Sequence, residues 1–102
     1  MDRLALLQEV LAQNPDDAFA RYGLAMEYVN QGDIETALSE FARLLQINPN
    51  YTAGYQMSAQ TLLKAGREEE ARKSLEAGIA SAVRTGNQHA RAEMEAMLDE
   101  LR

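Results

Sequence analysis

Apolar residues recur every three or four positions along the chain, within stretches of about 12 to 17 residues that suit helices. Turn signals separate these stretches, at Asn14-Pro15, Gly32-Asp33, Asn48-Pro49, Gly66 and Gly86-Asn87. The pattern predicts an all-α fold of about six helices, near 2–13, 16–31, 34–47, 51–65, 68–84 and 88–101. Because the joining loops are short, consecutive helices are expected to lie antiparallel as neighbours.

Three of the predicted helices share one apolar stripe, which we expect to face the core. The stripes are Leu6, Leu7, Val10 and Leu11 in the first helix, Ala37, Leu38, Phe41, Leu44 and Leu45 in the third, and Ala71, Leu75, Gly78 and Ile79 in the fifth. The second and fourth helices form another type, and the sixth begins a further copy of it. The stripe of the sixth helix is expected to cover the end of the core, with residues Met94, Met97, Leu98 and Leu101.

Several residues carry helix-boundary signals with a known physical cause. Gly32 and Gly66 can adopt the left-handed conformation that ends a helix. Asp33 is expected to cap the helix that follows it, and Asp16 to do the same for the second helix. The acidic run 68–70 falls in the first turn of the fifth helix, where carboxylates favour the positive end of the helix dipole. We interpret that run as an exposed helix start and not as a metal site.

A period of 34 residues relates the two halves of the chain. It separates Asn14-Pro15 from Asn48-Pro49, and Gly32 from Gly66. It also relates Leu7, Phe41 and Leu75, and likewise Leu11, Leu45 and Ile79. A fixed period of this length is typical of repeat proteins, in which each copy is one helical unit that needs a neighbour to bury its apolar face.

These residues resemble the tetratricopeptide repeat (TPR) family, whose unit is a pair of antiparallel helices. The first unit supplies Leu24-Ala25, Tyr28, Gly32-Asp33, Ala37, Phe41 and Pro49, and the second supplies Tyr55, Ala59, Leu62, Gly66, Ala71 and Leu75. The resemblance implies a right-handed superhelical stack of helix pairs. The chain departs from the family pattern at three positions: Arg21 replaces a large apolar residue, Leu44 replaces a usual small residue, and Val83 replaces the second closing proline. Gly78 takes the place equivalent to Leu44 in the second unit.

The period divides the 102 residues into four parts of one expected domain. Residues 1–15 form a half repeat, 16–49 and 50–84 are the two repeats, and 85–102 is the capping helix. Starting with half a repeat is compatible with a complete short protein and with a piece of a longer array.

Composition narrows the functional classes. The net charge of −6 argues against nucleic acid and against anionic membrane surfaces, which both attract basic patches. No segment approaches the ~18 apolar residues of a membrane span, and the first residues lack the features of a signal peptide. Without cysteine there is neither a disulfide nor a thiolate site, so we expect a cytoplasmic protein.

The sequence predicts no enzyme, no cofactor and no metal site. His89 is the only histidine, so neither a Ser–His–Asp nor a Cys–His pairing is available. Glu93 lies one helical turn after His89, but zinc sites normally need three or four protein ligands. The glycines are isolated and form no loop that could hold phosphate.

The candidate binding residues lie on the second and fourth helices. A second apolar stripe of the second helix is formed by Phe19, Tyr22, Met26 and Val29, with Asn30 beside it. The matching side of the fourth helix is more polar, with Gln56, Met57, Gln60 and Lys64. In the family this side lines a concave groove that binds peptides, and glutamine side chains can bond to an extended backbone. The resemblance therefore implies a protein–protein interaction module.

Two alternatives remain open at this stage. Phe19 and Val29 are equally well explained as core residues, because a helix packed on two sides is apolar on two sides. If the stripe is exposed, it could also close against a second copy of the chain and form a homodimer. The carboxylate clamp of some family members is absent, since Tyr22, Met26 and Gln60 occupy the corresponding places.

Overall fold

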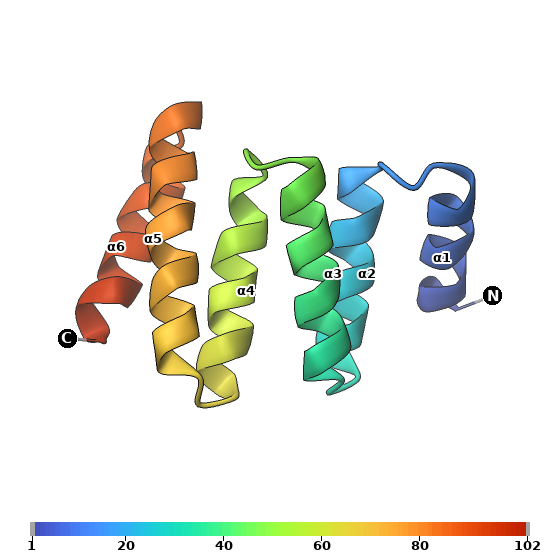
Figure 1. Cartoon of the computed structure of the whole chain (residues 1–102), viewed down its shortest axis with the longest axis horizontal. Helices are drawn as coiled ribbons and strands as arrows, with labels where there is room; N and C mark the ends of the chain where they lie inside the picture. The colour runs from blue at the N-terminus through green and yellow to red at the C-terminus, as the bar shows by residue number, and fades with distance from the viewer. Residues whose placement is uncertain (1, 102) are drawn as a thin grey trace. The chain divides into compact units, whose positions relative to one another are not determined.

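The computed structural model describes residues 2–101, and all regular structure in that range is α-helical (Figure 1). The helices are α1 (Arg3–Gln13), α2 (Ala18–Asn30), α3 (Ile34–Ile47), α4 (Thr52–Lys64), α5 (Glu68–Thr85) and α6 (Gln88–Glu100). The prediction of an all-α fold with six helices is confirmed for the described part of the chain. The predicted bounds agree with these to within two residues.

The chain forms two compact units that meet in the sequence at the second proline. The first unit is Met1–Asn48 and contains α1, α2 and α3, and the second is Pro49–Arg102 and contains α4, α5 and α6. Within the first unit α2 packs against both α1 and α3. Within the second unit α5 packs against both α4 and α6, and α6 also contacts α4.

Four helices begin at a side chain that caps them. The carboxylates of Asp2, Asp17 and Asp33 and the amide oxygen of Asn87 each accept a hydrogen bond from the backbone N–H three residues later. Asp33 was predicted to cap α3 and does so. The prediction for α2 is wrong, because the cap is Asp17, whose Oδ1 lies 3.0 Å from the nitrogen of Ala20. Asp16 stands one residue too early to reach that N–H.

Left-handed glycines follow three of the helices. Gly32 and Gly66 have φ of 79° and 75°, as predicted, and Gly86 has φ of 70°. At each of them the next residue donates its N–H to a carbonyl five residues back, which satisfies a carbonyl that the helix end would leave free. One of these bonds, from Arg67 to Leu62, is 2.9 Å long.

The core of the first unit lies on both sides of α2. Leu11, Ala20 and Leu24 are buried together with the partly buried Leu4, Leu7 and Tyr28, which join α1 to α2. Ala25 of α2 and the α3 residues Ala37 and Phe41 have no exposed surface. The prediction that Leu6 and Val10 also face the core is wrong, because 52% and 37% of their surface is exposed.

The core of the second unit is built around α5. Ala59, Leu75, Ala82, Ala90 and Met94 are buried together. Ile79, Met97, Leu98 and Leu101 pack against them, so the stripe predicted for the sixth helix does cover this core. Gly78 of α5 lies close to both neighbouring helices: a β-carbon placed there would meet Met94 of α6 and Cβ of Tyr55 of α4.

Candidate peptide-binding faces on α2 and α4

The α2 face of the first unit combines a free aromatic ring with half-buried neighbours. Phe19, in the first turn of α2, is 76% exposed, so it is not a core residue. Tyr22, Met26 and Val29 are half-buried, and Asn30 at the end of the helix is exposed. The opposite side of the same helix carries the buried Leu24 and Ala25. One side of α2 therefore holds the fold, and the other carries the exposed Phe19 among half-buried side chains.

Tyr22 is fixed by its contact with the third helix. Its ring meets that of Phe41 edge-on, with centroids 6.3 Å apart and planes inclined by 64°. This geometry suits the charge distribution of aromatic rings. Tyr22 therefore belongs partly to the core, and its replacement would disturb packing as well as the open face.

Burial raises the pKa of the Tyr22 phenol above its ordinary value near 10. The folded state thus favours the neutral phenol, so the contribution of Tyr22 to stability is complete below pH ~10 and is lost as the pH rises through the raised value. We expect a nuclear magnetic resonance titration of the Tyr22 ring carbon to show a midpoint above 10 in the native protein. In urea the midpoint should return to the ordinary value, and equal midpoints in the two states would contradict the burial.

The α4 face of the second unit is polar and is continued by α6. Gln56, Met57 and Gln60 are half-buried, and Lys64 is exposed in the last turn of α4. The side-chain amide of Gln56 donates to Oε1 of Glu93, 3.4 Å away on α6. The sequence pattern related Glu93 only to His89, one helical turn before it. The signal it lacked is the contact between α4 and α6, which joins residues 37 positions apart.

A buried ion pair at Arg21 ties the loop before α2 to α3. Arg21 is 7% exposed and stands two residues after Phe19 on α2. Its guanidinium lies 2.6 Å from Oε1 of Glu40 on α3 and donates to the backbone oxygen of Pro15, 2.9 Å away. The loop before α2 is thereby tied to the helix pair. The unusual Arg21 is explained by this partner, which lies 19 residues away in the sequence.

In the second unit, hydroxyl groups connect the helix pair to the proline loop in place of the ion pair. Tyr55 stands 34 residues after Arg21, and its hydroxyl donates to the backbone oxygen of Pro49 over 2.9 Å. Ser74 stands 34 residues after Glu40 and donates to the backbone oxygen of Tyr55. The two repeats therefore fix the proline loop at equivalent positions, once with a buried charge pair and once with two hydroxyls.

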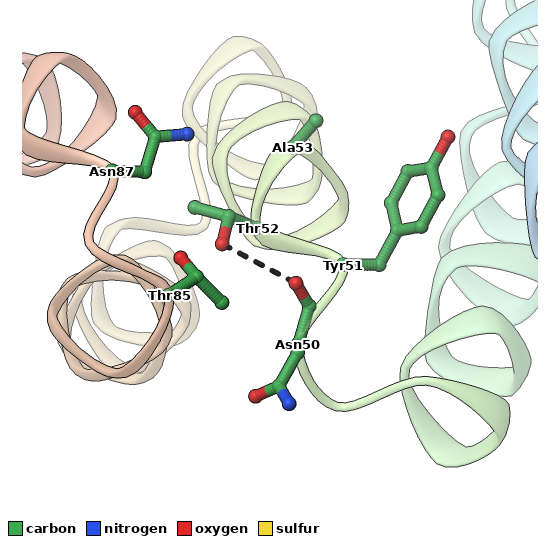
Figure 2. A pocket seen from close by; sticks show the side chains of 6 residues that line it. All are labelled: Asn50, Tyr51, Thr52, Ala53, Thr85 and Asn87. Atoms are coloured by element: carbon green, nitrogen blue, oxygen red, sulfur yellow. Dashed lines mark hydrogen bonds between the residues drawn. The ribbon is translucent and has the colours of Figure 1, made fainter.

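A hollow of about 370 Å³ lies where α4 begins and α5 ends (Figure 2). It is lined by Asn50, Tyr51, Thr52, Ala53, Thr85 and Asn87. Its polar side chains already take part in structural hydrogen bonds. The hydroxyls of Thr52 and Ser81 share a hydrogen bond, Asn87 caps α6, and the side-chain oxygen of Asn50 accepts a hydrogen bond from Arg84. The lining therefore serves the fold, and we assign no ligand to this hollow.

Neither a cluster of metal-ligating side chains nor a membrane-spanning helix is found among residues 2–101. Among them no group of three or more His, Asp or Glu side chains is placed to hold a metal ion. His89 is exposed, with Nε2 3.3 Å from the carboxylate of Glu93, a pair with no third ligand. None of the described helices has the length and apolar character needed to cross a membrane.

Comparison with known proteins identifies the family. Two tetratricopeptide repeat models match the chain, one over residues 28–93 and one over residues 6–39. A TPR repeat-containing protein of Pseudomonas aeruginosa is 34% identical over 95 residues, which are 93% of this chain and 90% of the relative. The chain belongs to the tetratricopeptide repeat family, as its sequence pattern indicated.

Solved structures share the fold. A protein of Bordetella parapertussis is 27% identical with a TM-score of 0.84, and the match covers 99% of this chain and 88% of that one. The structure of PcrH in complex with the chaperone binding region of PopD has a TM-score of 0.89 at 20% identity, covering 96% of this chain and 74% of that one. At this identity the second likeness concerns the fold alone.

Proposed function

We propose that this TPR protein is a non-enzymatic interaction module that binds a segment of another protein through the first helices of its pairs. The α2 contacts are Phe19, Tyr22, Met26, Val29 and Asn30, and the α4 contacts are Gln56, Met57, Gln60 and Lys64. The observation that carries the proposal is the exposure of Phe19 beside a half-buried apolar stripe. The exposed ring and the half-buried apolar side chains beside it form one apolar patch, and such patches often mark the contact with a partner.

The chemistry of the two faces suggests how such a segment is held. The ring of Phe19 with Met26 can receive an apolar side chain, and burial of one large side chain contributes about 1.5–3 kcal/mol. Gln56 and Gln60 offer both donors and acceptors to an extended backbone. PcrH, a solved structure of this fold, is complexed with a region of another protein. We expect a reversible complex, formed in the cytoplasm.

The test is the replacement Phe19→Ser, with Val83→Ser as its matched control. Val83 is also an exposed apolar residue of a helix, at 56%, but it belongs to α5 and is part of neither face. Peptides of about twelve residues are selected by display against the native protein, and their affinities are measured by fluorescence anisotropy. Phe19→Ser should weaken the selected peptides by about 10- to 150-fold, because it removes one buried contact of the complex. Val83→Ser should leave them unchanged.

Two results would contradict the proposal. If the selected peptides bind the native protein and the Phe19→Ser variant with equal affinity, the α2 face is not part of the binding site. A concentration-dependent dimer in light scattering that Phe19→Ser makes monomeric would show that the stripe serves self-association, the alternative role of the same face.

A further inference from the structure

The outer face of α1 is apolar, exposed and hollowed. Leu6 and Val10 lie one helical turn apart, and with Glu9 and Gln13 they line a hollow of about 230 Å³. The core side of the same helix is formed by Leu4, Leu7 and Leu11, which contact α2. Leu6 and Val10 therefore stand beside the core stripe but are not covered by it.

The internal repeat shows what kind of element fits this face. Leu6 is related by 34 and 68 residues to Glu40 and Ser74, and Val10 is related by 68 residues to Gly78. Glu40 contacts Arg21, while Ser74 and Gly78 contact Tyr55. Arg21 and Tyr55 both belong to the first helix of their pair. In both complete pairs the position of Leu6 is thus contacted by a helix, and in the second pair the position of Val10 is as well.

The described part of the chain provides no such helix for α1. A helix docked there would lie along α1 as α2 lies along α3. Its contact residue would differ from Arg21 and Tyr55, because Leu6 is apolar where Glu40 and Ser74 are polar. The face therefore requires apolar side chains on the docked helix, at the spacing of one helical turn.

The charge of the first unit decides between possible occupants. Residues 1–48 contain three Arg and no Lys against eight Asp and Glu, which leaves −5 of the chain's −6. Glu9, at the edge of the hollow, has no ion-pair partner among residues 2–101. If a second copy docked through this face, two first units that each carry a net charge of −5 would repel each other. A segment carrying Lys or Arg beside its apolar residues would be attracted instead.

We propose that the face formed by Leu6, Glu9, Val10 and Gln13 docks an amphipathic, basic helix of a partner protein. The helix presents apolar residues to Leu6 and Val10, and a Lys or Arg on its flank pairs with Glu9. This site lies on α1 and is separate from the α2 and α4 faces, so it does not depend on the function proposed above.

The experiment uses two labelled synthetic peptides of about twenty residues with the same charge. In the first, leucines form a helical stripe flanked by lysines, and in the second every leucine is replaced by serine. The native protein should bind the leucine peptide, and its backbone amide shifts should change mainly at residues 3–13. The double replacement Leu6→Ser with Val10→Ser should weaken this binding at least tenfold, and Val83→Ser should not alter it.

Further measurements separate the apolar and charged contributions. Glu9→Gln should weaken the leucine peptide at low salt and reduce the salt dependence of its affinity. Because Leu6 and Val10 are exposed, the double variant should keep the helix content and melting temperature of the native protein, which circular dichroism checks. A Phe19→Ser variant should bind the leucine peptide as the native protein does.

Three outcomes would overturn the inference. The serine peptide could bind as tightly as the leucine peptide, which would show attraction by charge alone. The double variant could bind unchanged, or the amide shifts could fall only on α2 or α4. Lastly, light scattering could show a dimer that the double variant abolishes, in which case a second copy occupies the face.

Discussion

Replacing Arg21 with methionine should destabilise the first unit by about 3 kcal/mol, the low end of the 3–5 kcal/mol found when a buried ion pair loses one partner. The replacement leaves the carboxylate of Glu40 without its cation and the loop oxygen of Pro15 without its donor. We expect the low end because Glu40 keeps 22% of its side-chain surface in water, which relieves part of the penalty. Urea denaturation followed by circular dichroism measures the loss.

The second repeat supplies the matched control for this prediction. The double replacement Arg21→Tyr with Glu40→Ser copies Tyr55 and Ser74, which fix the equivalent loop without charge. Because exchanging a buried pair for neutral groups is often neutral or stabilising, the double variant should recover most of the lost stability. Glu40→Ser alone should be destabilising, since it leaves the guanidinium buried. Single changes that cost nothing would show that the pair is solvated and does not hold the fold.

Gly78→Ala should destabilise the second unit by about 1–3 kcal/mol, the usual cost of overpacking a core. This change in stability is opposite in sign to the ordinary effect of the substitution, because alanine normally stabilises a helix interior by about 1 kcal/mol relative to glycine. The cause is the space at Gly78: a β-carbon would lie 2.5 Å from Sδ of Met94 and 2.7 Å from Cβ of Tyr55. The thermal midpoint, followed by circular dichroism, measures the effect.

Gly23→Ala is the control for the helical glycine. Its β-carbon would meet Cδ2 of Leu7 at 3.3 Å, the end of a side chain that can rotate away. We expect this variant to range from neutral to about 1 kcal/mol more stable. Shortening Met94 to alanine in the Gly78→Ala background should recover little. The remaining clash is with Cβ of Tyr55, which is attached directly to the backbone of α4 and cannot rotate away. A stabilising Gly78→Ala would show that the three helices have room to separate.

The fold was predictable because its signals are local and repeated. Gly32 and Gly66 end helices through their own backbone conformation, and Asp33 caps the next helix through its own side chain. None of these needs a distant partner. Asp16 and Asp17 show the limit of such signals: both are good capping residues, and a shift of one position decides which carboxylate reaches the N–H of Ala20.

The candidate site was less predictable because exposure depends on neighbours that are remote in the sequence. The apolar pattern of α1 placed Leu6 in the core, but only the pairing of helices shows which side of α1 is covered. The same holds for Phe19, which fits a buried or an open stripe equally well until the packing of α2 is known. The role of Arg21 required Glu40, and that of Gln56 required Glu93, each on another helix. The site on α2 and α4 stays a prediction until binding is measured.

The absence of a closing proline at Val83 has a consequence for how such proteins could be lengthened. Without it α5 runs on to Thr85, and Arg84 in its last turn donates to the backbone oxygen of Pro49 and to the side chain of Asn50. A deviation from the consensus thus acts as a brace on the preceding linker. Restoring proline at 83 in order to add another repeat would end α5 earlier and remove these two hydrogen bonds, so lengthening the array at this end would free the segment 49–50 from α5.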